Sequence, residues 1–388
     1  MMTKNVGVIG GGQLAWMMAL VAPQENIKIY IQTPHETDSA VCLGERTIFA
    51  PVDDVSATAE LAKYCDVITF ENEFVDLEGL QSLVKEGVCF YPRLTSLSPL
   101  LDKFDQRSFF QSQGFPVPRF SLYESDSDFQ SFSFPLVLKA RRHGYDGQGT
   151  VIVKSPLELQ SALEKFKQTP LLIEEFVPFE KELAIMAARS ATGEIKIYPV
   201  VETYQENQVC RWVIAPALIS QDITEKISAC CEADPFGIAS KLLISLDYVG
   251  ILGIELFMKN NGEVLINEVA PRTHNSGHYT LDACETSQFA MQLQAITGKK
   301  LGDTQLKSSG AVMINLLGYE SAQSEYLSQR KEIEQLGAFV HWYGKTESRQ
   351  GRKLGHVTVL LDEKSPEKMY HQAQMAIEKV ESIWYPQR

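Results

Sequence analysis

A segment late in the chain gathers side chains that could do chemistry together. Residues 267–278 read Asn-Glu-Val-Ala-Pro-Arg-Thr-His-Asn-Ser-Gly-His, which supplies a carboxylate, a guanidinium, imidazole and carboxamides. The segment follows the apolar run 264–266, so we expect it to leave the end of a strand. Glu255 stands thirteen residues before Glu268, on a similar apolar run at 251–258.

These two acids form a candidate metal site. Asn260-Asn261-Gly262 lies between the two apolar runs and predicts a hairpin, in which side chains of neighbouring strands can face the same way. Carboxylates suit Mg²⁺, a hard cation that prefers oxygen ligands. Arg272 would lie beside the ion, where it could neutralise an oxyanion. A surface hairpin with a polar exit loop is the alternative, and the mixture of polar types argues against it.

Composition bounds the class of protein. The chain has 388 residues, enough for two or three domains, with 44% hydrophobic and 22% charged residues, as in ordinary globular proteins. A formal net charge of −13 argues against a protein that binds nucleic acid electrostatically. It does not exclude a small anionic substrate, because a few arginines in a cleft can dominate the local field.

Cysteine usage and hydropathy bear on location. The seven cysteines are scattered and form no Cys-x-x-Cys pair, so a reducing compartment is expected, with each cysteine a small buried residue. The sequence enters a strand almost at once and shows no signal peptide. No apolar run approaches membrane-spanning length. We therefore expect a cytoplasmic protein.

The first hundred residues alternate strand-like and helix-like patterns, which is typical of a doubly wound parallel sheet. Ser56 is a plausible N-cap for the second helix. The expected strands are 6–9, 27–31, 67–70 and 89–91, and the expected helices are 13–21, 56–63 and 77–85.

The rest of the chain mixes helices and strands less regularly. A boundary at 92–99 and a second near 178 predict three parts: 1–99, 100–178 and 179–388. The middle part should hold a helix at 102–113, strands at 136–139, 150–153 and 171–175 and a helix at 156–166; the last part should hold strands within 182–198 and 209–214, long helices at 222–245 and 282–296, short strands from 311, and a closing helix at 366–380.

Two glycine-rich loops could bind phosphate. The first, residues 10–15, fits the loose dinucleotide pattern Gly-x-Gly-x-x-Ala between a strand and a helix. The acidic residue expected after the second strand is absent, since residues 32–34 are Gln-Thr-Pro, which argues against a nicotinamide cofactor. An anion could still bind at the helix N-terminus, and a tight turn without a ligand is the alternative.

The second loop, residues 143–150, has three glycines whose backbone amides could fold over a polyanion. Lys139 ends the preceding strand and suits a point-charge contact to phosphate. The alternative is a flexible hairpin with basic residues in solvent. Farther on, residues 171–177 end a strand in two acids and an extended stretch whose backbone could contact an adenine edge, and Glu182 could accept from ribose hydroxyls.

Together these features resemble the ATP-grasp ligases. Residues 271–278, Pro-Arg-Thr-His-Asn-Ser-Gly-His, are similar to the motif of the N5-carboxyaminoimidazole ribonucleotide synthetases within them. Segments 10–14, 69–73, 144–147 and 351–356 agree in the expected order. The resemblance implies an α/β and α+β architecture with an N-terminal Rossmann-like parallel-sheet domain, a small lid domain and a larger C-terminal α+β domain.

The resemblance also implies a reaction. ATP phosphorylates bicarbonate to carboxyphosphate, which carboxylates aminoimidazole ribonucleotide and yields ADP and phosphate. On the ATP side, Glu255 and Glu268 hold Mg²⁺ with Asn267 nearby; Lys103 and Lys139 contact phosphates; Gly144, Tyr145, Asp146, Gly147, Gln148, Gly149 and Thr150 close over them; and Glu174, Glu175, Phe176, Val177, Glu182 and Gln205 surround the adenosine.

The same resemblance assigns the other two substrates. Asp146 becomes a candidate for receiving the amine proton, and the enzyme would be a homodimer, as is common in the family. Arg272, His274 and Asn275 would bind bicarbonate or carboxyphosphate; Tyr145 and Asp146 would face the aminoimidazole; Lys345, Arg352 and Lys353 would hold the 5′-phosphate; and Gln13 and Glu73 would line the ribonucleotide.

The chain departs from the family pattern at three places. Ala15-Trp16 replaces Gly-Arg after the first glycine loop, and Gln205 replaces a histidine of the adenosine region. Gln148 stands where a basic residue usually follows Tyr-Asp-Gly, which removes a cation near the second substrate. The alternatives are a formate-dependent ribonucleotide transformylase of the same superfamily and a non-enzymatic nucleotide-binding regulator. Lys345, Arg352 and the histidine motif favour the bicarbonate enzyme.

Overall fold

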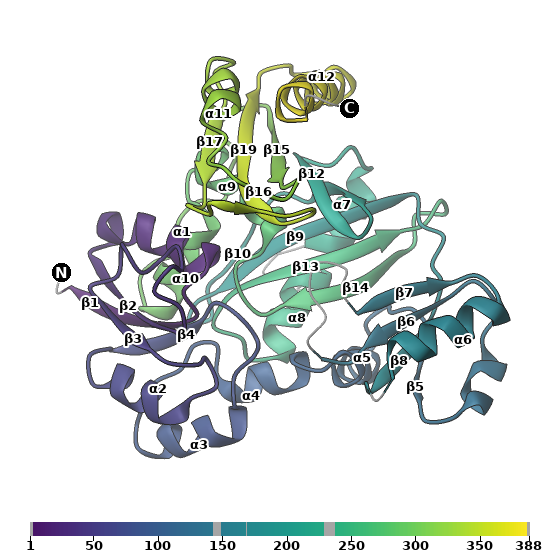
Figure 1. Cartoon of the computed structure of the whole chain (residues 1–388), viewed down its shortest axis with the longest axis horizontal. Coiled ribbons are helices and arrows are strands. Elements are labelled where there is room, and N and C mark those ends of the chain that lie inside the picture. The colour runs from purple at the N-terminus through teal and green to yellow at the C-terminus, as the bar shows by residue number, and fades with distance from the viewer. Residues whose placement is uncertain (1–2, 143–148, 168, 229–236, 386–388) are drawn as a thin grey trace.

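The computed structural model describes residues 3–142, 149–167, 169–228 and 237–385. In Figure 1 a large central sheet is flanked by the N-terminal sheet on one side and a small sheet on the other, and α12 packs near the top. None of the helices within these ranges is long and apolar enough to cross a bilayer. The expected alternation of parallel strands and helices at the start of the chain is confirmed.

The N-terminal sheet is parallel with the order β3-β2-β1-β4. Strand order reverses at β1, which has β2 on one side and β4 on the other, and ligands of such sheets bind where the order reverses. Gly10 and Glu71 follow the carboxyl ends of β1 and β4. The elements are β1 Lys4–Ile9, α1 Gln13–Val21, η1 Ala22–Glu25, β2 Ile27–Thr33, β3 Arg46–Phe49, α2 Val55–Ala62, β4 Val67–Phe70, α3 Leu77–Lys85, α4 Leu94–Leu97 and η2 Ser98–Leu100.

Two expectations for this region were wrong, and one strand was not expected. Asp54, rather than Ser56, caps α2, because its carboxylate accepts the Ala57 N–H at 3.0 Å. The edge strand β3 was missed, since it is short and only partly buried. The expected strand 89–91 reduces to one bridge between Phe90 and Ile68. Short edge segments carry little hydrophobic periodicity, so pattern alone places them poorly.

A small antiparallel sheet with the order β5-β8-β6-β7 follows, covered by α6 (Figure 1). Asp102 caps the preceding helix α5 by accepting the Phe104 N–H at 2.8 Å, so α5 starts where the sequence predicts. β5 falls in a stretch that carried no motif. The elements are α5 Lys103–Ser112, β5 Phe120–Tyr123, η3 Asp126–Ser131, β6 Leu136–Ala140, β7 Thr150–Val153, α6 Pro156–Lys165 and β8 Leu171–Glu175.

The central nine-stranded sheet is antiparallel along β14-β13-β9-β11-β12-β15-β19-β17, with β10 paired to β9. β14 is its edge on the side of the small sheet (Figure 1). The strands are β9 Lys181–Arg189, β10 Ile195–Ile197, β11 Val201–Glu206, β12 Val209–Ala215, β13 Gly250–Met258, β14 Val264–Ala270, β15 Gly310–Leu317, β17 Phe339–Trp342 and β19 Lys353–Leu361; β16 Ala322–Gln323 and β18 Glu347–Ser348 pair separately.

Two expected long helices are interrupted. The helix expected at 222–245 is α7 and α8, and α8 starts afresh after Gly237, whose backbone is extended. The helix expected at 282–296 stops at Ala283, because the backbone of Cys284 is extended. It resumes at Gln288, where Ser287 caps the second part. The helices are α7 Gln221–Ser228, α8 Ile238–Ser245, η4 Asn275–Gly277, α9 Thr280–Ala283, α10 Gln288–Ile296, α11 Leu327–Glu334 and α12 Pro366–Trp384.

Candidate active site

Glu255 and Glu268 lie on neighbouring strands of a hairpin, as the sequence predicts, and a register shift after Glu255 makes them direct cross-strand partners of β13 and β14. Burial, followed by the charge of Glu268, raises the pKa of Glu255 to about 7. Burial would also raise the pKa of Glu268, but Lys103 at 2.7 Å holds it below its usual range. The pair therefore concentrates negative charge in a partly buried place, which a divalent cation would relieve.

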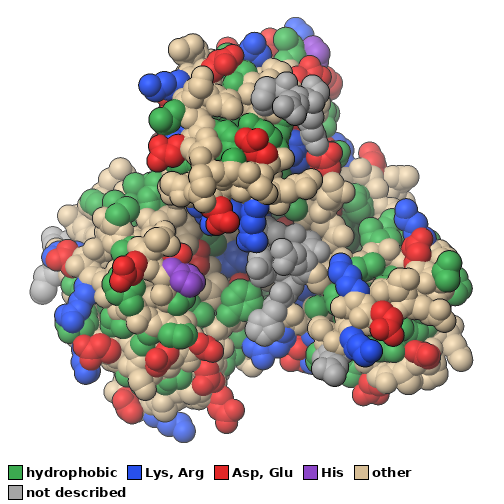
Figure 2. Space-filling view, in the orientation of Figure 1, with side chains coloured by type: hydrophobic (Ala, Val, Ile, Leu, Met, Phe, Trp, Pro, Cys, Tyr) green, Lys and Arg blue, Asp and Glu red, His purple; other side chains and the backbone are tan. Residues whose placement is uncertain are grey.

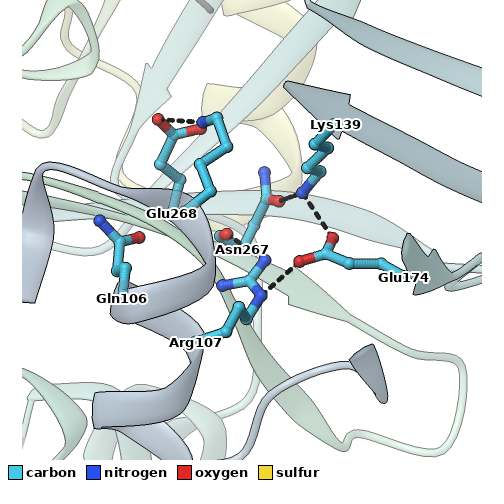
Figure 3. Close-up of a pocket in the computed structure, with 7 residues that line it drawn as sticks. Gln106, Arg107, Lys139, Glu174, Asn267 and Glu268 are labelled. Atoms are coloured by element: carbon cyan, nitrogen blue, oxygen red, sulfur yellow. Dashed lines mark hydrogen bonds and ion pairs between the residues drawn. The ribbon is translucent and has the colours of Figure 1, made fainter. Parts of the chain in front are cut away.

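Cations from two other elements converge on this hairpin. Lys139 of β6 lies 2.6 Å from Glu174 and donates to the Asn267 side chain at 3.2 Å. Arg107 of α5 pairs with the other carboxylate oxygen of Glu174. Burial opposes the ionisation of Glu174, yet these two cations lower its pKa to about 2. Figure 3 shows this group lining one pocket, together with Gln106 and Glu268.

Sequence reasoning missed Gln106 and Arg107, although a signal was present. Lys103, Gln106 and Arg107 are spaced i, i+3, i+4 on a predicted helix and so share one face. Gln106 donates to the Val269 carbonyl and accepts the Val269 N–H, both at 3.1 Å. Gln106 thereby satisfies the backbone N–H and carbonyl that Val269 presents at the free edge of β14, next to Glu268. The helix α5 thus holds the backbone beside Glu268, the candidate metal ligand, in place, and it also supplies Lys103.

Segment 267–278 reaches the N-terminal domain through Arg272, whose Nε lies 3.0 Å from Glu73. His274 Nε2 lies 3.5 Å from Glu255, so the imidazole borders the carboxylate pair. Asn275 is buried and exchanges two hydrogen bonds with Asn315, at 2.9 and 2.8 Å. Its predicted contact with bicarbonate is untested, and these bonds give it a structural task.

The first glycine loop packs against Glu71. A Cβ at Gly10 or Gly12 would come within 2.6 Å of the Glu71 carboxylate, so only glycine leaves room there. Burial is the main reason that the pKa of Glu71 is raised to about 7, although Arg272 opposes it. The loop is therefore shaped around Glu71, an acid to which the sequence alone assigns no role.

The predicted 5′-phosphate residues lie at the boundary between the N-terminal and C-terminal domains. Lys345 donates to Gln13 at 3.0 Å and to the Lys353 carbonyl at 2.9 Å, which brings three of the predicted residues together. Arg352 bonds the Glu347 carbonyl at 2.8 Å and its carboxylate at 3.2 Å. In the space-filling view the lobes surround a hollow where lysine and arginine side chains gather (Figure 2).

The predicted adenosine residues lie along neighbouring strands. Glu174 forms ion pairs with Lys139 and Arg107, and these contacts do not support the predicted role in adenosine binding. Burial, followed by the charge of Glu255, raises the pKa of Glu182 to about 8. Glu175 ends β8 before Phe176 and Val177, and Gln205 lies at a bulge of β11. Gly149 directly precedes β7 and Thr150 begins it, whereas Gly144, Tyr145, Asp146, Gly147 and Gln148 fall outside the described residues.

A second polar cluster lies between α9 and β17–β19. Asp282, His341 and His356 bring possible ligand atoms within 4.8 Å of one another. The two imidazole rings stack with an interplanar angle of 17°, so their in-plane lone pairs run side by side instead of converging on one ion. His341 Nε2 lies 2.9 Å from Asp282, and Tyr343 bonds His356 Nδ1. We interpret this cluster as a hydrogen-bonded packing contact.

The raised pKa of Glu255 predicts how stability depends on pH without ligands. Between about pH 4.5 and 7 Glu255 ionises in the unfolded chain but keeps its proton in the native protein. The free energy of unfolding therefore falls as pH rises through this range. A Glu255→Gln variant cannot ionise there. The difference in melting temperature, variant minus wild type, should therefore increase from about pH 5 to pH 7 and stay constant above pH 7. Thermal unfolding checks this; a pH-independent difference contradicts it.

Comparisons with known proteins agree along the whole chain. Residues 2–99 match the family model "Ribonucleotide synthetase preATP-grasp domain", 108–289 match "ATP-grasp domain" and 311–368 match "Phosphoribosylaminoimidazole carboxylase C-terminal domain". The N5-carboxyaminoimidazole ribonucleotide synthase of Synechococcus elongatus is 51% identical over 98% of this chain and 95% of its own.

Solved structures agree as well. The N5-carboxyaminoimidazole ribonucleotide synthetase of Thermotoga maritima is 38% identical, with a TM-score of 0.85 over 97% of this chain and 98% of that one. The Aspergillus clavatus synthase, solved with ADP and 5-aminoimidazole ribonucleotide, is 28% identical, with a TM-score of 0.88 over 98% of both chains. These matches confirm the predicted ATP-grasp architecture. The chain belongs to the N5-carboxyaminoimidazole ribonucleotide synthase family of ATP-grasp ligases.

Proposed function

We propose that the protein uses ATP and bicarbonate to carboxylate 5-aminoimidazole ribonucleotide, forming N5-carboxyaminoimidazole ribonucleotide, ADP and phosphate in purine biosynthesis. One observation carries the site assignment. Lys103 pairs with Glu268, His274 lies beside Glu255, and Arg272 lies on the same exit segment as His274. Groups that suit a triphosphate therefore border groups that suit a small oxyanion, which is what transfer from ATP to bicarbonate needs.

We further propose Mg²⁺ as the metal at Glu255 and Glu268. The donor set fits, because two carboxylates face each other across the hairpin and Asn267 Nδ2 lies 3.4 Å from Glu255. When bound, the ion would neutralise charge on the phosphate oxygens. Lys103, now paired with Glu268, and Lys139, now paired with Glu174, would turn toward the phosphates and orient the γ-phosphate.

The chain's own side chains divide the two chemical steps. Arg272 and His274 would hold bicarbonate while its oxygen attacks the γ-phosphorus and ADP leaves. The exocyclic amine of the ribonucleotide then attacks the carboxyl carbon, and phosphate leaves. Asp146 would take the amine proton in that second step. A homodimer, which rests on the family resemblance, and a cytoplasmic location, which rests on cysteine usage and hydropathy, stay predictions.

The decisive experiment measures ADP formation by the purified protein with ATP and Mg²⁺. Bicarbonate and aminoimidazole ribonucleotide together should give ADP and consume the ribonucleotide. Replacing bicarbonate with formate should give none, which separates this function from a transformylase. A protein that binds nucleotide but forms no ADP under any of these conditions would instead be a regulator.

Arg352→Ala should weaken binding of the ribonucleotide selectively. A lost charge-assisted contact to phosphate costs about 1.5–3 kcal/mol, so the KM for aminoimidazole ribonucleotide should rise roughly tenfold to hundredfold. The KM for ATP should change little. Arg349→Ala is a matched control, because Arg349 is an exposed arginine of the same turn. Equal rises of both constants would give Arg352 a structural role, through its bonds to Glu347.

A further inference from the structure

Gln288, the first residue of α10, is completely buried and holds the backbone of His274 from both sides. Its amide oxygen accepts the His274 N–H at 2.9 Å, and its amide nitrogen donates to the His274 carbonyl at 2.8 Å. The same nitrogen lies 3.0 Å from Nδ1 of His278. Only one orientation of the amide satisfies all three contacts, so the side chain has a single fixed position.

The imidazole of His274 is fixed in turn. Its Nδ1 accepts the Ser276 N–H at 3.4 Å and lies 2.9 Å from the Ser276 hydroxyl, which leaves Nε2 pointing toward Glu255 at 3.5 Å. Gly253, two residues before Glu255 on β13, makes room for this ring, because a Cβ there would lie 2.5 Å from the His274 Cβ. The ring therefore sits against the strand that carries a candidate metal ligand.

The segment has one further attachment to the same helix end. Thr280 Oγ1 accepts the backbone N–H of Gln288 at 2.9 Å and donates to the Gly277 carbonyl at 2.6 Å. A Cβ at Gly277 would lie 2.7 Å from Gln288 Oε1, so the segment passes directly over the glutamine. The start of α10 thus forms a rigid base under residues 274–280.

We propose that Gln288 is a positioning residue for the bicarbonate step, acting through His274. It touches no substrate itself. Its two bonds set the place of the His274 backbone, Ser276 sets the ring, and Nε2 is thereby presented where bicarbonate meets the γ-phosphate. This inference rests on the proposed function, because it assigns His274 to the oxyanion. Positioning matters because a displacement of about 1 Å can cost on the order of 10²-fold in rate.

The test is the kinetics of Gln288→Met, which keeps length and burial but removes every amide contact. The kcat/KM for bicarbonate should fall roughly hundredfold, while the KM values for ATP and ribonucleotide should stay within about threefold. ATP should be spared because Lys103 and Lys139 come from α5 and β6. Equal changes for all substrates, or no change for bicarbonate, would overturn the proposal.

Gln292→Met is the matched control. Gln292 lies one turn further along α10, is equally buried, and bonds the Ile251 N–H at 2.7 Å and Thr69 at 2.8 Å. The Gln292→Met variant should lower the melting temperature as Gln288→Met does, yet keep the wild-type kcat/KM for bicarbonate. A bicarbonate defect of the same size in both variants would show that loss of stability, rather than loss of positioning, is responsible.

Gln288→Glu provides a second measurement if the methionine variant fails to fold. A protonated carboxyl can accept the His274 N–H and donate to its carbonyl, whereas the carboxylate loses the donor and repels that carbonyl. Its bicarbonate-dependent rate, relative to wild type at the same pH, should therefore rise as pH falls. A ratio of variant to wild-type rate that does not change with pH overturns the inference. A wild type without bicarbonate-dependent ADP formation would instead overturn the proposed function.

Discussion

A Glu268→Gln variant should fold normally and form almost no ADP. The carboxylate is the direct cross-strand partner of Glu255 and lies 2.7 Å from Lys103. Glutamine keeps the size and the hydrogen-bonding reach of the side chain but removes the negative charge. The site then loses the stronger of its two candidate anions, because Lys103 holds the pKa of Glu268 low while burial and Glu268 raise that of Glu255.

The size of the loss follows from what the charge does. Removing one preorganised electrostatic group from an active site commonly costs about 10²–10³-fold in kcat. Here the carboxylate is also one of two proposed metal ligands, so the phosphates would lose the cation that neutralises their charge. We therefore expect kcat to fall by at least roughly 10³-fold, while the melting temperature stays close to that of the wild type.

Coupled-enzyme assays of ADP, with Mg²⁺ and nucleotide in excess, measure the effect. Glu263→Gln is the control, because Glu263 belongs to the same hairpin, is exposed, and pairs only with Lys259 among the described residues. That variant should keep full activity. Wild-type rates in a folded Glu268→Gln protein would remove Glu268 from the metal site and weaken the whole assignment of the ATP-binding face.

The sequence was sufficient for the carboxylate hairpin because its signals are local. Two apolar runs and Asn260-Asn261-Gly262 predict a hairpin that brings the two acids near each other. A β-bulge between Glu255 and Leu256, which the sequence does not reveal, then shifts the register so that Glu255 pairs with Glu268. The strand–glycine–helix order at the N-terminus likewise predicted β1 and α1. Such signals need only period and turn chemistry, which the order of residues contains.

Long-range partners could not be predicted in this way. Gln106 bonds the backbone of the edge strand β14, and Gln288 bonds the backbone of His274. A glutamine in a predicted helix carries no signal of such a contact, because its partners are distant in the sequence. Helix interruptions were missed for a related reason. The helix expected at 282–296 is broken at Cys284, whose backbone is extended, and Ser287 caps a new helix that begins at Gln288.

A last pair of variants should separate the two chemical steps. Arg272→Ala should lose bicarbonate-dependent ATP cleavage altogether, because the guanidinium stabilises charge while bicarbonate attacks the γ-phosphate. Arg272 is partly buried, and Glu73 at 3.0 Å holds it at the edge of the site. Asp146, outside the described residues, should act later, when the amine attacks the activated carboxyl.

Asp146→Asn should therefore keep slow bicarbonate-dependent ATP cleavage and fail to couple it to the ribonucleotide. Losing one positioned proton acceptor commonly costs about 10²–10⁴-fold in rate, so carboxyphosphate would decompose before the amine attacks. Phosphate release and ribonucleotide consumption are measured side by side, and their ratio should rise far above one. If the ratio stays at one with a near-normal rate, Asp146 is not the base, and the loop that carries it serves only to cover the phosphates.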